Sequence, residues 1–209
     1  MQAEFTEVIT SQNQLREIVG HPAERNVHKV IPLIDEHCRM FISKSPFMLL
    51  ATSDSHGKID VSPKGDPPGF VQVLDESTLA IPDRPGNRRA DSLTNILQNP
   101  RVGLLFMIPG KRETLRVSGS ARIVRDVWLR EQMAVNGKLP SLAVVVRVEA
   151  AFIHCAKCVI RSHLWESEQW PNLAGLSPLA RVIIDHANLS IDIDEYQETI
   201  DDNYRTALY

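Results

Sequence analysis

Apolar residues along the chain follow two different periods, and the change lies near Pro46. Before Pro46 they recur at the three- and four-residue spacing of a helix, first over residues 15–19 and again over 30–41. The sequence Gly20-His21-Pro22 lies between the two series and is typical of a break. The pattern therefore predicts an N-terminal helical extension over residues 1–44.

After Pro46 the apolar residues form short continuous or alternating runs bounded by turn sequences, which indicates strands. The runs are FMLLATSD, IDVSPKGD, FVQVLD, TLAIPD, RVGLLFMI, TLRVSGSARIV and SLAVVVRVEAAFIH. Helical spacing returns from Arg88 to about Asn99, in VWLREQMAV, and over residues 177–187 and 192–206.

Six or seven short strands with few helices between them favour an α+β fold: a small antiparallel β-barrel with N-terminal and peripheral helices. The helices are too few for repeated βαβ units, and no G-x-G-x-x-G sequence supports a dinucleotide-binding sheet. We expect a single domain over residues 1–209, with the barrel core in 45–160 and a C-terminal extension in 161–209.

Composition and charge narrow the classes of function. The chain has 209 residues, of which 43% are hydrophobic and 23% charged, and its formal net charge is −3. That charge argues against a nucleic-acid binder with a general basic surface. No apolar run is long enough to cross a membrane, and the acidic start MQAEFTEVITSQNQL fits neither a secretory signal nor a transit peptide. We expect a cytoplasmic protein without a nucleic-acid or membrane partner.

The three cysteines, Cys38, Cys155 and Cys158, do not suggest a disulfide framework, because their number is odd and no secretory signal precedes them. Cys155 and Cys158 form a C-x-x-C, which is compatible with a redox pair or with half of a zinc site. The sequence has neither a second cysteine pair nor a thioredoxin-like βαβ context. We therefore predict no metal site.

The most unusual charge cluster is PDRPGNRRADSL, residues 82–93. Its Gly-Asn turn predicts Asn87 as a helix N-cap, which places Arg88 and Arg89 in the first helical turn. Cations are disfavoured there, because the free N–H groups already make that end of a helix positive. Either the arginines pair with aspartates on a solvated surface, or they bind an anion such as phosphate. The pairs open to the first alternative are Asp91–Arg88, Asp83–Arg84 and Asp83–Arg89.

Two strand segments add polar groups. Lys64 lies in DVSPKGDPPGF, where Gly65 and the prolines stop the pairing, so its side chain either points into a pocket beside the barrel or lies in solvent. In ETLRVSGSA, Thr114, Arg116 and Ser118 share one face of a strand. That face either lines a polar ligand site or is turned to water.

Together these segments resemble a known family. The run PDRPGNRRADSLTNILQNPRVGLLF, followed by ETLRVSGSARIV, resembles the pyridoxamine 5'-phosphate oxidase-like FMN-binding proteins, which are split-barrel flavoproteins. A longer resemblance, from about Gln14 to Trp165, is to a branch other than the true oxidase, which carries SPF, VSPKGD, PDRPGN and an HCAK segment.

The resemblance implies an FMN at the interface of a homodimer, with each barrel contributing to both sites. Arg88 and Arg89 match the family's basic pair that grips the FMN phosphate, and Asn87 shapes the turn before them. Lys64 matches the strand-end lysine near the isoalloxazine ring. The other cofactor-binding candidates are Ser62 and Pro63 beside that lysine, Pro82 and Asp83 through their backbone, and Thr114 with Arg116 on the later strand.

The segment HCAKCVIRSHLWES, after the last predicted strand, supplies candidates for the substrate side. The resemblance places them near the open face of the flavin, where Trp165 can stack on a planar substrate and Arg161 can pair with its charge. The alternative is a helix start with ordinary surface cations. The candidates are His154, Lys157, Arg161 and Trp165.

Two departures from the true oxidase concern its substrate. Ile59 stands where the oxidase carries an arginine five residues before the strand-end lysine, and residues 185–209 hold no counterpart of its Arg-Leu-His-Asp-Arg segment. We therefore do not expect vitamin B6 oxidation. We expect an FMN-dependent oxidoreductase that acts on an unidentified small molecule, with an electron donor such as a nicotinamide nucleotide.

Other functions remain open at the level of sequence. One is a flavin-binding or ligand-sensing module without turnover, because a fold does not fix a function. Another is a barrel that holds haem or a deazaflavin instead of FMN.

Overall fold

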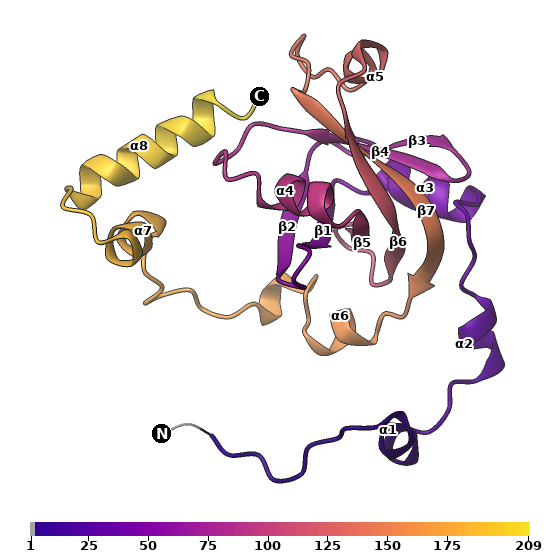
Figure 1. The fold of residues 1–209 in the computed structure, drawn as a ribbon. Helices are drawn as coiled ribbons and strands as arrows, with labels where there is room; N and C mark the ends of the chain where they lie inside the picture. The colour runs from indigo at the N-terminus through magenta and orange to yellow at the C-terminus, as the bar shows by residue number, and fades with distance from the viewer. Residues whose placement is uncertain (1–2) are drawn as a thin grey trace.

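The computed structural model of the protein describes residues 3–209, and its centre is one antiparallel sheet of seven strands (Figure 1). The strands follow the order β2-β1-β5-β6-β7-β4-β3. Their bounds are β1 (Phe47–Ser53), β2 (Ile59–Gly65), β3 (Gln72–Asp75), β4 (Thr78–Asp83), β5 (Arg101–Met107), β6 (Thr114–Val124) and β7 (Leu142–His154). All seven predicted strands are confirmed, and the fold is the predicted α+β split barrel.

Eight helices and one 3₁₀ turn are assigned within residues 3–209. They are α1 (Gln12–Val19), α2 (Glu24–His28), α3 (Glu36–Lys44), α4 (Asp91–Gln98), α5 (Val127–Gln132), α6 (Lys157–Arg161), α7 (Leu179–Ala187), α8 (Ile193–Thr206) and η1 (Ser167–Gln169). The helices predicted in VWLREQMAV and over 177–187 and 192–206 are confirmed as α5, α7 and α8.

The sheet curls because its two longest strands, β6 and β7, carry an irregularity in their pairing. The register between them shifts at Ser118 and Gly119, and a bulge of this kind increases the local twist. One side of the pair continues into β5, β1 and β2, and the other into β4 and β3. The end strands β2 and β3 do not pair with each other within residues 3–209, so the barrel is open there.

The hydrophobic core lies inside the curled sheet, because in most of its strands every second side chain is apolar and points inward. In β1, Met48, Leu50 and Thr52 are buried, while the residues between them are partly exposed, as the period of a half-buried strand requires. Helix α3 closes one end of the barrel with Phe41 and Ile42. Other buried core residues are Leu79, Ile81, Val102, Leu104, Phe106, Leu115, Val117 and Val146.

The second predicted N-terminal helix is wrong over residues 30–35. Between α2 and α3, Ile31 exchanges two backbone hydrogen bonds with Ala151 of β7, at 3.0 and 2.7 Å. Pro32 has no N–H group to offer a helix, and pairing with β7 satisfies the backbone of Ile31 instead. Helix α3 begins only after Asp35, whose carboxylate accepts a hydrogen bond from the Cys38 N–H at 2.8 Å.

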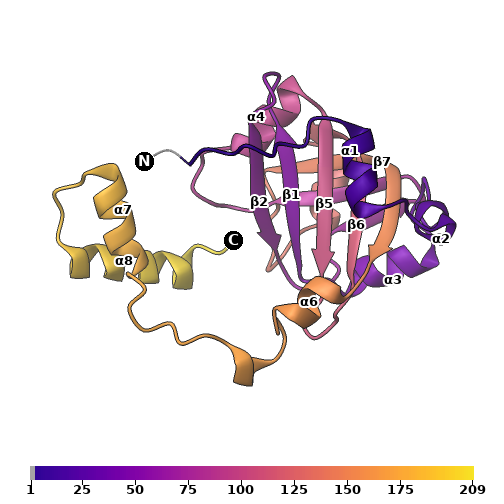
Figure 2. The same cartoon turned by 90° about the horizontal axis from the view of Figure 1, so that it is seen from below.

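The terminal helices α1, α2, α7 and α8 lie outside the barrel, and the chain end after α8 returns to it (Figures 1 and 2). Helices α1 and α2 bury none of their residues, and the described chain before α1 runs past the sheet without pairing with it. Helices α7 and α8 contact each other and form a separate hairpin beside the barrel. Within residues 3–209, every helix is too short or too polar to cross a membrane.

Candidate functional site

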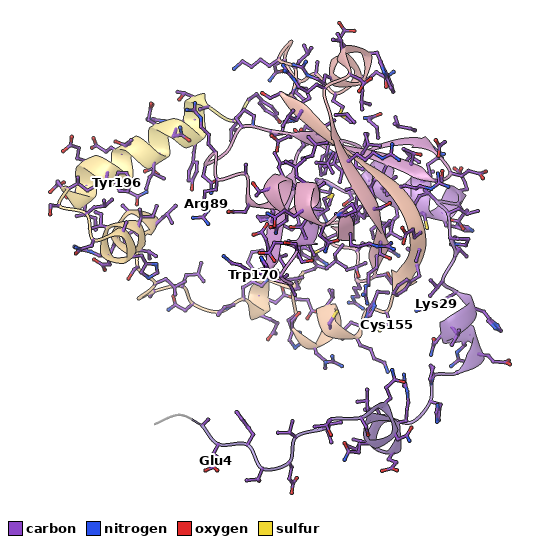
Figure 3. The ribbon with its side chains drawn as sticks, in the orientation of Figure 1. Glu4, Lys29, Arg89, Cys155, Trp170 and Tyr196 are labelled. Atoms are coloured by element: carbon purple, nitrogen blue, oxygen red, sulfur yellow. The ribbon has the colours of Figure 1, made fainter. Side chains whose placement is uncertain are left out.

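A pocket of about 700 Å³ lies beside edge strand β2, the loop that follows β4, and the start of α4. Most of the predicted cofactor-binding residues line it. They are Ser62, Pro63, Lys64, Asp83, Asn87, Arg88 and Arg89. Arg89 projects on the side that faces the C-terminal helices (Figure 3). The structure therefore brings together two stretches that are about twenty residues apart in the sequence.

Strand β2 presents polar groups to the pocket because it is an edge strand. Lys64 pairs with Met48 of β1 on one side, and the other edge of β2 has no strand beside it within residues 3–209. Pro63 is tolerated in this strand for the same reason, because an edge position does not need its missing N–H. Asp60, Ser62 and Lys64 alternate along β2, so all three lie on the half-buried face that lines the pocket.

The loop between β4 and α4 corrects the predicted helix start. Helix α4 begins at Asp91 with Ala90 as its N-cap, so Arg88 and Arg89 precede the helix. Arg88 and Ala90 both have left-handed backbone conformations, with φ of 61° and 56°. Asn87 does not cap α4; its side-chain oxygen accepts a hydrogen bond from the Arg89 N–H at 3.0 Å. Such local bonding by asparagine competes with helix formation, and the helix therefore starts later.

The ion pairs of this loop also differ from those considered from the sequence. Arg89 pairs with Asp91 at 2.7 Å, and its side chain is 70% exposed, so this pair adds little stability. Arg84 pairs with Asp66 instead of Asp83. Arg88 has no ion pair within residues 3–209. The guanidinium group of Arg88 is thus free to bind an anion, and that of Arg89 is held only by an exposed ion pair.

The acidic groups of the pocket are mostly engaged with the protein. Asp60 accepts a hydrogen bond at 2.7 Å from the hydroxyl of Ser92, which is buried at the start of α4. This contact fastens α4 to β2. Asp83, at the end of β4, is partly buried; burial raises the pKa of its carboxyl, and Lys64 opposes that shift. The sequence reasoning missed Asp60 and Ser92, although Asp60 alternates with Ser62 and Lys64 in the sequence.

The other predicted cofactor-binding residues lie outside this pocket. Pro82 is buried within β4. Thr114 is buried at the start of β6, opposite His154 at the end of β7. Arg116 lies over the ring of Phe152, with its guanidinium carbon 5.1 Å from the ring centre. Arg116 lines a smaller hollow of about 270 Å³ on the outer face of the sheet.

Of the substrate-side candidates, His154 lies opposite Thr114 of this second group. The Nδ1 atom of His154 is buried without a hydrogen-bond partner within residues 3–209. Lys157 and Arg161 are exposed on α6. The indole N–H of Trp165 donates to the carbonyl of Lys111 at 2.8 Å, which holds Trp165 against the turn before β6. In one chain, these residues do not line the pocket at β2.

The donor set of the pocket fits a ligand that carries phosphate. Arg88 and Arg89 offer forked donors that match phosphate oxygens, and Lys64 adds a third positive charge. The volume of about 700 Å³ lies within the range of small-molecule and cofactor sites. The backbone strain at Arg88 is also informative, since left-handed non-glycine residues concentrate at ligand sites.

Comparison with known families decides where the chain belongs. The family model of pyridoxamine 5'-phosphate oxidase matches residues 34–155, which is more than half of the chain. The chain belongs to the pyridoxamine 5'-phosphate oxidase family. The part that matches the family runs from just before α3 to the end of β7, so it contains the whole barrel and every residue that lines the pocket except Asn203 and Ala207. The terminal helices lie outside it.

Solved structures resemble the barrel at low sequence identity. HupZ from Group A Streptococcus is 18% identical, with a TM-score of 0.47 over 57% of this chain and 93% of that one. General stress protein 26 from Bacillus anthracis is 17% identical, with a TM-score of 0.43 over 55% and 88%. An FMN-binding protein from Syntrophomonas wolfei is 10% identical, with a TM-score of 0.43 over 56% and 88%. No match is found among the curated proteins.

Proposed function

We propose that this member of the pyridoxamine 5'-phosphate oxidase family binds FMN in the pocket at β2 and acts as an FMN-dependent oxidoreductase on a small molecule. The observation that carries the proposal is the gathering of Lys64, Arg88 and Arg89 around one pocket of about 700 Å³. FMN when bound supplies two-electron redox chemistry at its ring. The residues of the chain supply binding, orientation and charge.

Each basic residue has a distinct role in this proposal. Arg88, which has no ion pair within residues 3–209, binds the phosphate, and Arg89 joins it by exchanging Asp91 for phosphate oxygens. Lys64, half-buried at the end of β2, places positive charge beside the ring and so favours electron uptake there. Ser62, Pro63 and Asp83 line the same pocket.

A homodimer is the assembly that this proposal requires. The predicted residues fall into two groups within one chain, one at the β2 pocket and one around Thr114 and His154 on β6 and β7. Two copies arranged so that one copy's β6–β7 end faces the other's pocket would unite the groups. Thr114 and Arg116 of one copy then reach the cofactor of the other, and His154, Lys157, Arg161 and Trp165 lie on the substrate side of the site. A cytoplasmic location and a nicotinamide electron donor complete the proposal.

The similar structures bear on the cofactor only by analogy. One is an FMN-binding protein, and another similar structure, 20% identical, is an F420 reductase. A deazaflavin stays the main alternative to FMN. Ile59 stands where the true oxidase carries an arginine, so we propose a substrate other than a B6 vitamer.

The visible spectrum of the purified protein, followed by mass spectrometry of the released cofactor, tests the proposal. We expect a yellow protein that takes up one FMN per chain and elutes as a dimer in size-exclusion chromatography with light scattering. A colourless protein that takes up no FMN would overturn it. A spectrum typical of haem or of a deazaflavin would identify that group, instead of FMN, as the cofactor.

Turnover separates the oxidoreductase from a binding module. NADH or NADPH added without oxygen should bleach the flavin absorption, and a quinone or oxygen should restore it. If neither nucleotide bleaches the bound cofactor, the binding or sensing module becomes the better description.

A further inference from the structure

Helix α8 forms part of the pocket, although it lies outside the family match and more than a hundred residues from β2 in sequence. Asn203 and Ala207, near the end of α8, line the same pocket as Lys64 and Arg88. The hairpin of α7 and α8 stands beside the barrel, and its far end returns toward the β4–α4 loop (Figure 1). Segment 193–209, which we term the C-terminal wall, is therefore one side of the candidate site.

One cluster fastens this wall to the barrel. The hydroxyl of Tyr209 donates to Asp66 Oδ1 at 2.6 Å, and Nε of Arg84 donates to Asp66 Oδ2 at 2.5 Å. The guanidinium carbon of Arg84 lies 5.5 Å from the centre of the Tyr209 ring. Lys138 Nζ donates to the Tyr209 carbonyl at 2.7 Å. Both oxygens of one carboxylate are thus used, one for the loop after β4 and one for the wall.

The positions of Asp66 and Arg84 connect this cluster to the cofactor residues. Asp66 lies two residues after Lys64, and Arg84 lies four residues before Arg88 and itself lines the pocket. The Asp66 side chain is 1% exposed and the Arg84 side chain 15% exposed. A carboxylate buried this deeply needs every partner it has, because an unpaired buried charge is costly. The cluster therefore has one well-defined arrangement.

Little else holds the wall in place. Within residues 3–209, the side-chain hydrogen bonds that join residues 170–209 to the barrel all involve Tyr209. Helix α8 buries none of its residues and contacts mainly α7. Loss of the Tyr209 hydroxyl leaves only the bond from Lys138 to the Tyr209 carbonyl, and should therefore loosen the wall without unfolding the barrel.

We propose that the C-terminal wall retains the cofactor in the β2 pocket, with Tyr209 and Asp66 as the positioning residues that hold it closed. The inference rests on the proposed binding of FMN there. Asn203 is the residue of the wall whose amide is placed to contact the ligand, since it lines the pocket and its side chain can both donate and accept.

The test compares Tyr209→Phe with Tyr204→Phe. Tyr204 lies on the same helix, is 56% exposed and has no side-chain hydrogen bond within residues 3–209, so its variant controls for loss of a hydroxyl. We expect FMN to leave the Y209F protein about tenfold faster than the wild type, the effect of losing one hydrogen bond to a charged group. Release from Y204F should be unchanged. Equal release rates in all three proteins would overturn the proposal.

A second readout needs no cofactor. Lys64 lines the pocket, whereas Lys58 is exposed at the turn before β2. A small amine-reactive reagent that acetylates lysines should therefore reach Lys64 more slowly while the C-terminal wall is closed. Mass spectrometry measures the extent of labelling at each lysine. In cofactor-free protein, Y209F and Asp66→Asn should raise the labelling rate of Lys64 several-fold relative to that of Lys58. An unchanged ratio of Lys64 to Lys58 labelling would overturn the proposed role of the C-terminal wall, even if the protein binds FMN. Failure of the wild type to bind FMN would instead overturn the proposed function, and the labelling ratio would still decide the wall.

Discussion

A Cβ atom on Gly119 of β6 would lie 1.9 Å from the carbonyl oxygen of Arg147 on β7, and 2.9 Å from the carbonyl carbon. The contact arises at the irregular pairing between Ser118 and Gly119, where the register of the two long strands shifts. Both nearby atoms belong to the backbone, so neither can rotate away. The curvature of the barrel therefore depends on the absence of a side chain at residue 119.

Replacement of this glycine tests that relationship. Gly119→Ala should lower the free energy of unfolding by about 3 kcal/mol, because the strands must separate to admit the methyl group. Chemical denaturation followed by circular dichroism measures the change. Gly103→Ala on β5 is the control: its Cβ would lie 3.8 Å from the Ala51 Cβ, an ordinary contact, and should change stability by less than about 1 kcal/mol. Equal losses in the two variants would contradict the prediction.

The pair Arg88 and Arg89 is predicted to bind the FMN phosphate. The double variant Arg88→Ala with Arg89→Ala should lose about 1.5–3 kcal/mol of FMN binding per charge-assisted contact. Its folding should be preserved, since Arg88 has no ion pair within residues 3–209 and the pair of Arg89 is exposed. Fluorescence titration of the cofactor-free protein with FMN measures the affinity.

The matched control for these arginines is Arg122→Ala with Arg125→Ala. Both residues are exposed beyond the pocket, at and just after the end of β6, so their loss removes the same net charge from a different place. FMN affinity should stay within about twofold of the wild type, apart from screened long-range effects. An equal loss in both double variants would mean that general positive charge, and not a phosphate clamp, binds the cofactor.

The carboxyl of Asp83 should impose a pH dependence on stability. Burial raises its pKa in the folded protein above the usual 3.8, so the folded protein binds this proton more tightly than the unfolded chain does. The stability that this proton contributes is fully present below pH 3.8 and is lost as the pH rises through the folded pKa. Asp83→Asn should therefore gain in melting temperature relative to the wild type between about pH 4 and pH 7.

Asp54 supplies a control of opposite sign for Asp83. The N–H groups of Lys58 and His56 donate to its carboxylate at 2.9 and 2.8 Å, and they lower the pKa of Asp54. Its contribution is present above pH 3.8 and is lost as the pH falls through the lowered folded pKa. Asp54→Asn should lose melting temperature relative to the wild type at pH 7 and recover at low pH. A common pH trend in D83N and D54N would contradict both assignments.

The thiols should divide by reactivity. Burial, with help from the neighbouring Asp35, raises the pKa of Cys38 to about 12, whereas Cys155 and Cys158 are exposed. A thiol reagent at pH 8 should label two cysteines in the native protein and the third only in denaturant. Labelling of Cys38 at the rate of the others would show that α3 does not stay on the barrel.

Short apolar runs, continuous or alternating and bounded by turn sequences, by themselves indicated all seven strands, because a strand must bury its apolar face and end where a turn begins. The same local logic located α5, α7 and α8. It failed over residues 30–35, where Ile31 pairs with Ala151, and at Asn87, where side-chain bonding delays α4. In both places a backbone N–H group found a hydrogen-bond partner outside a helix, and helical spacing alone cannot reveal such a partner.

The residues of the candidate site likewise divide into those that the sequence reveals and those that only the tertiary structure reveals. Lys64, Arg88 and Arg89 could be named from the sequence, since strand-end and turn residues carry recognisable signals and resemble a known pattern. Only the tertiary structure placed Arg84 on Asp66, separated Thr114 and His154 from the pocket, and brought Tyr209 to Asp66 across 143 positions of the chain. Contacts between distant segments depend on how the sheet curls and where the last helix returns, and neither is written in local spacing.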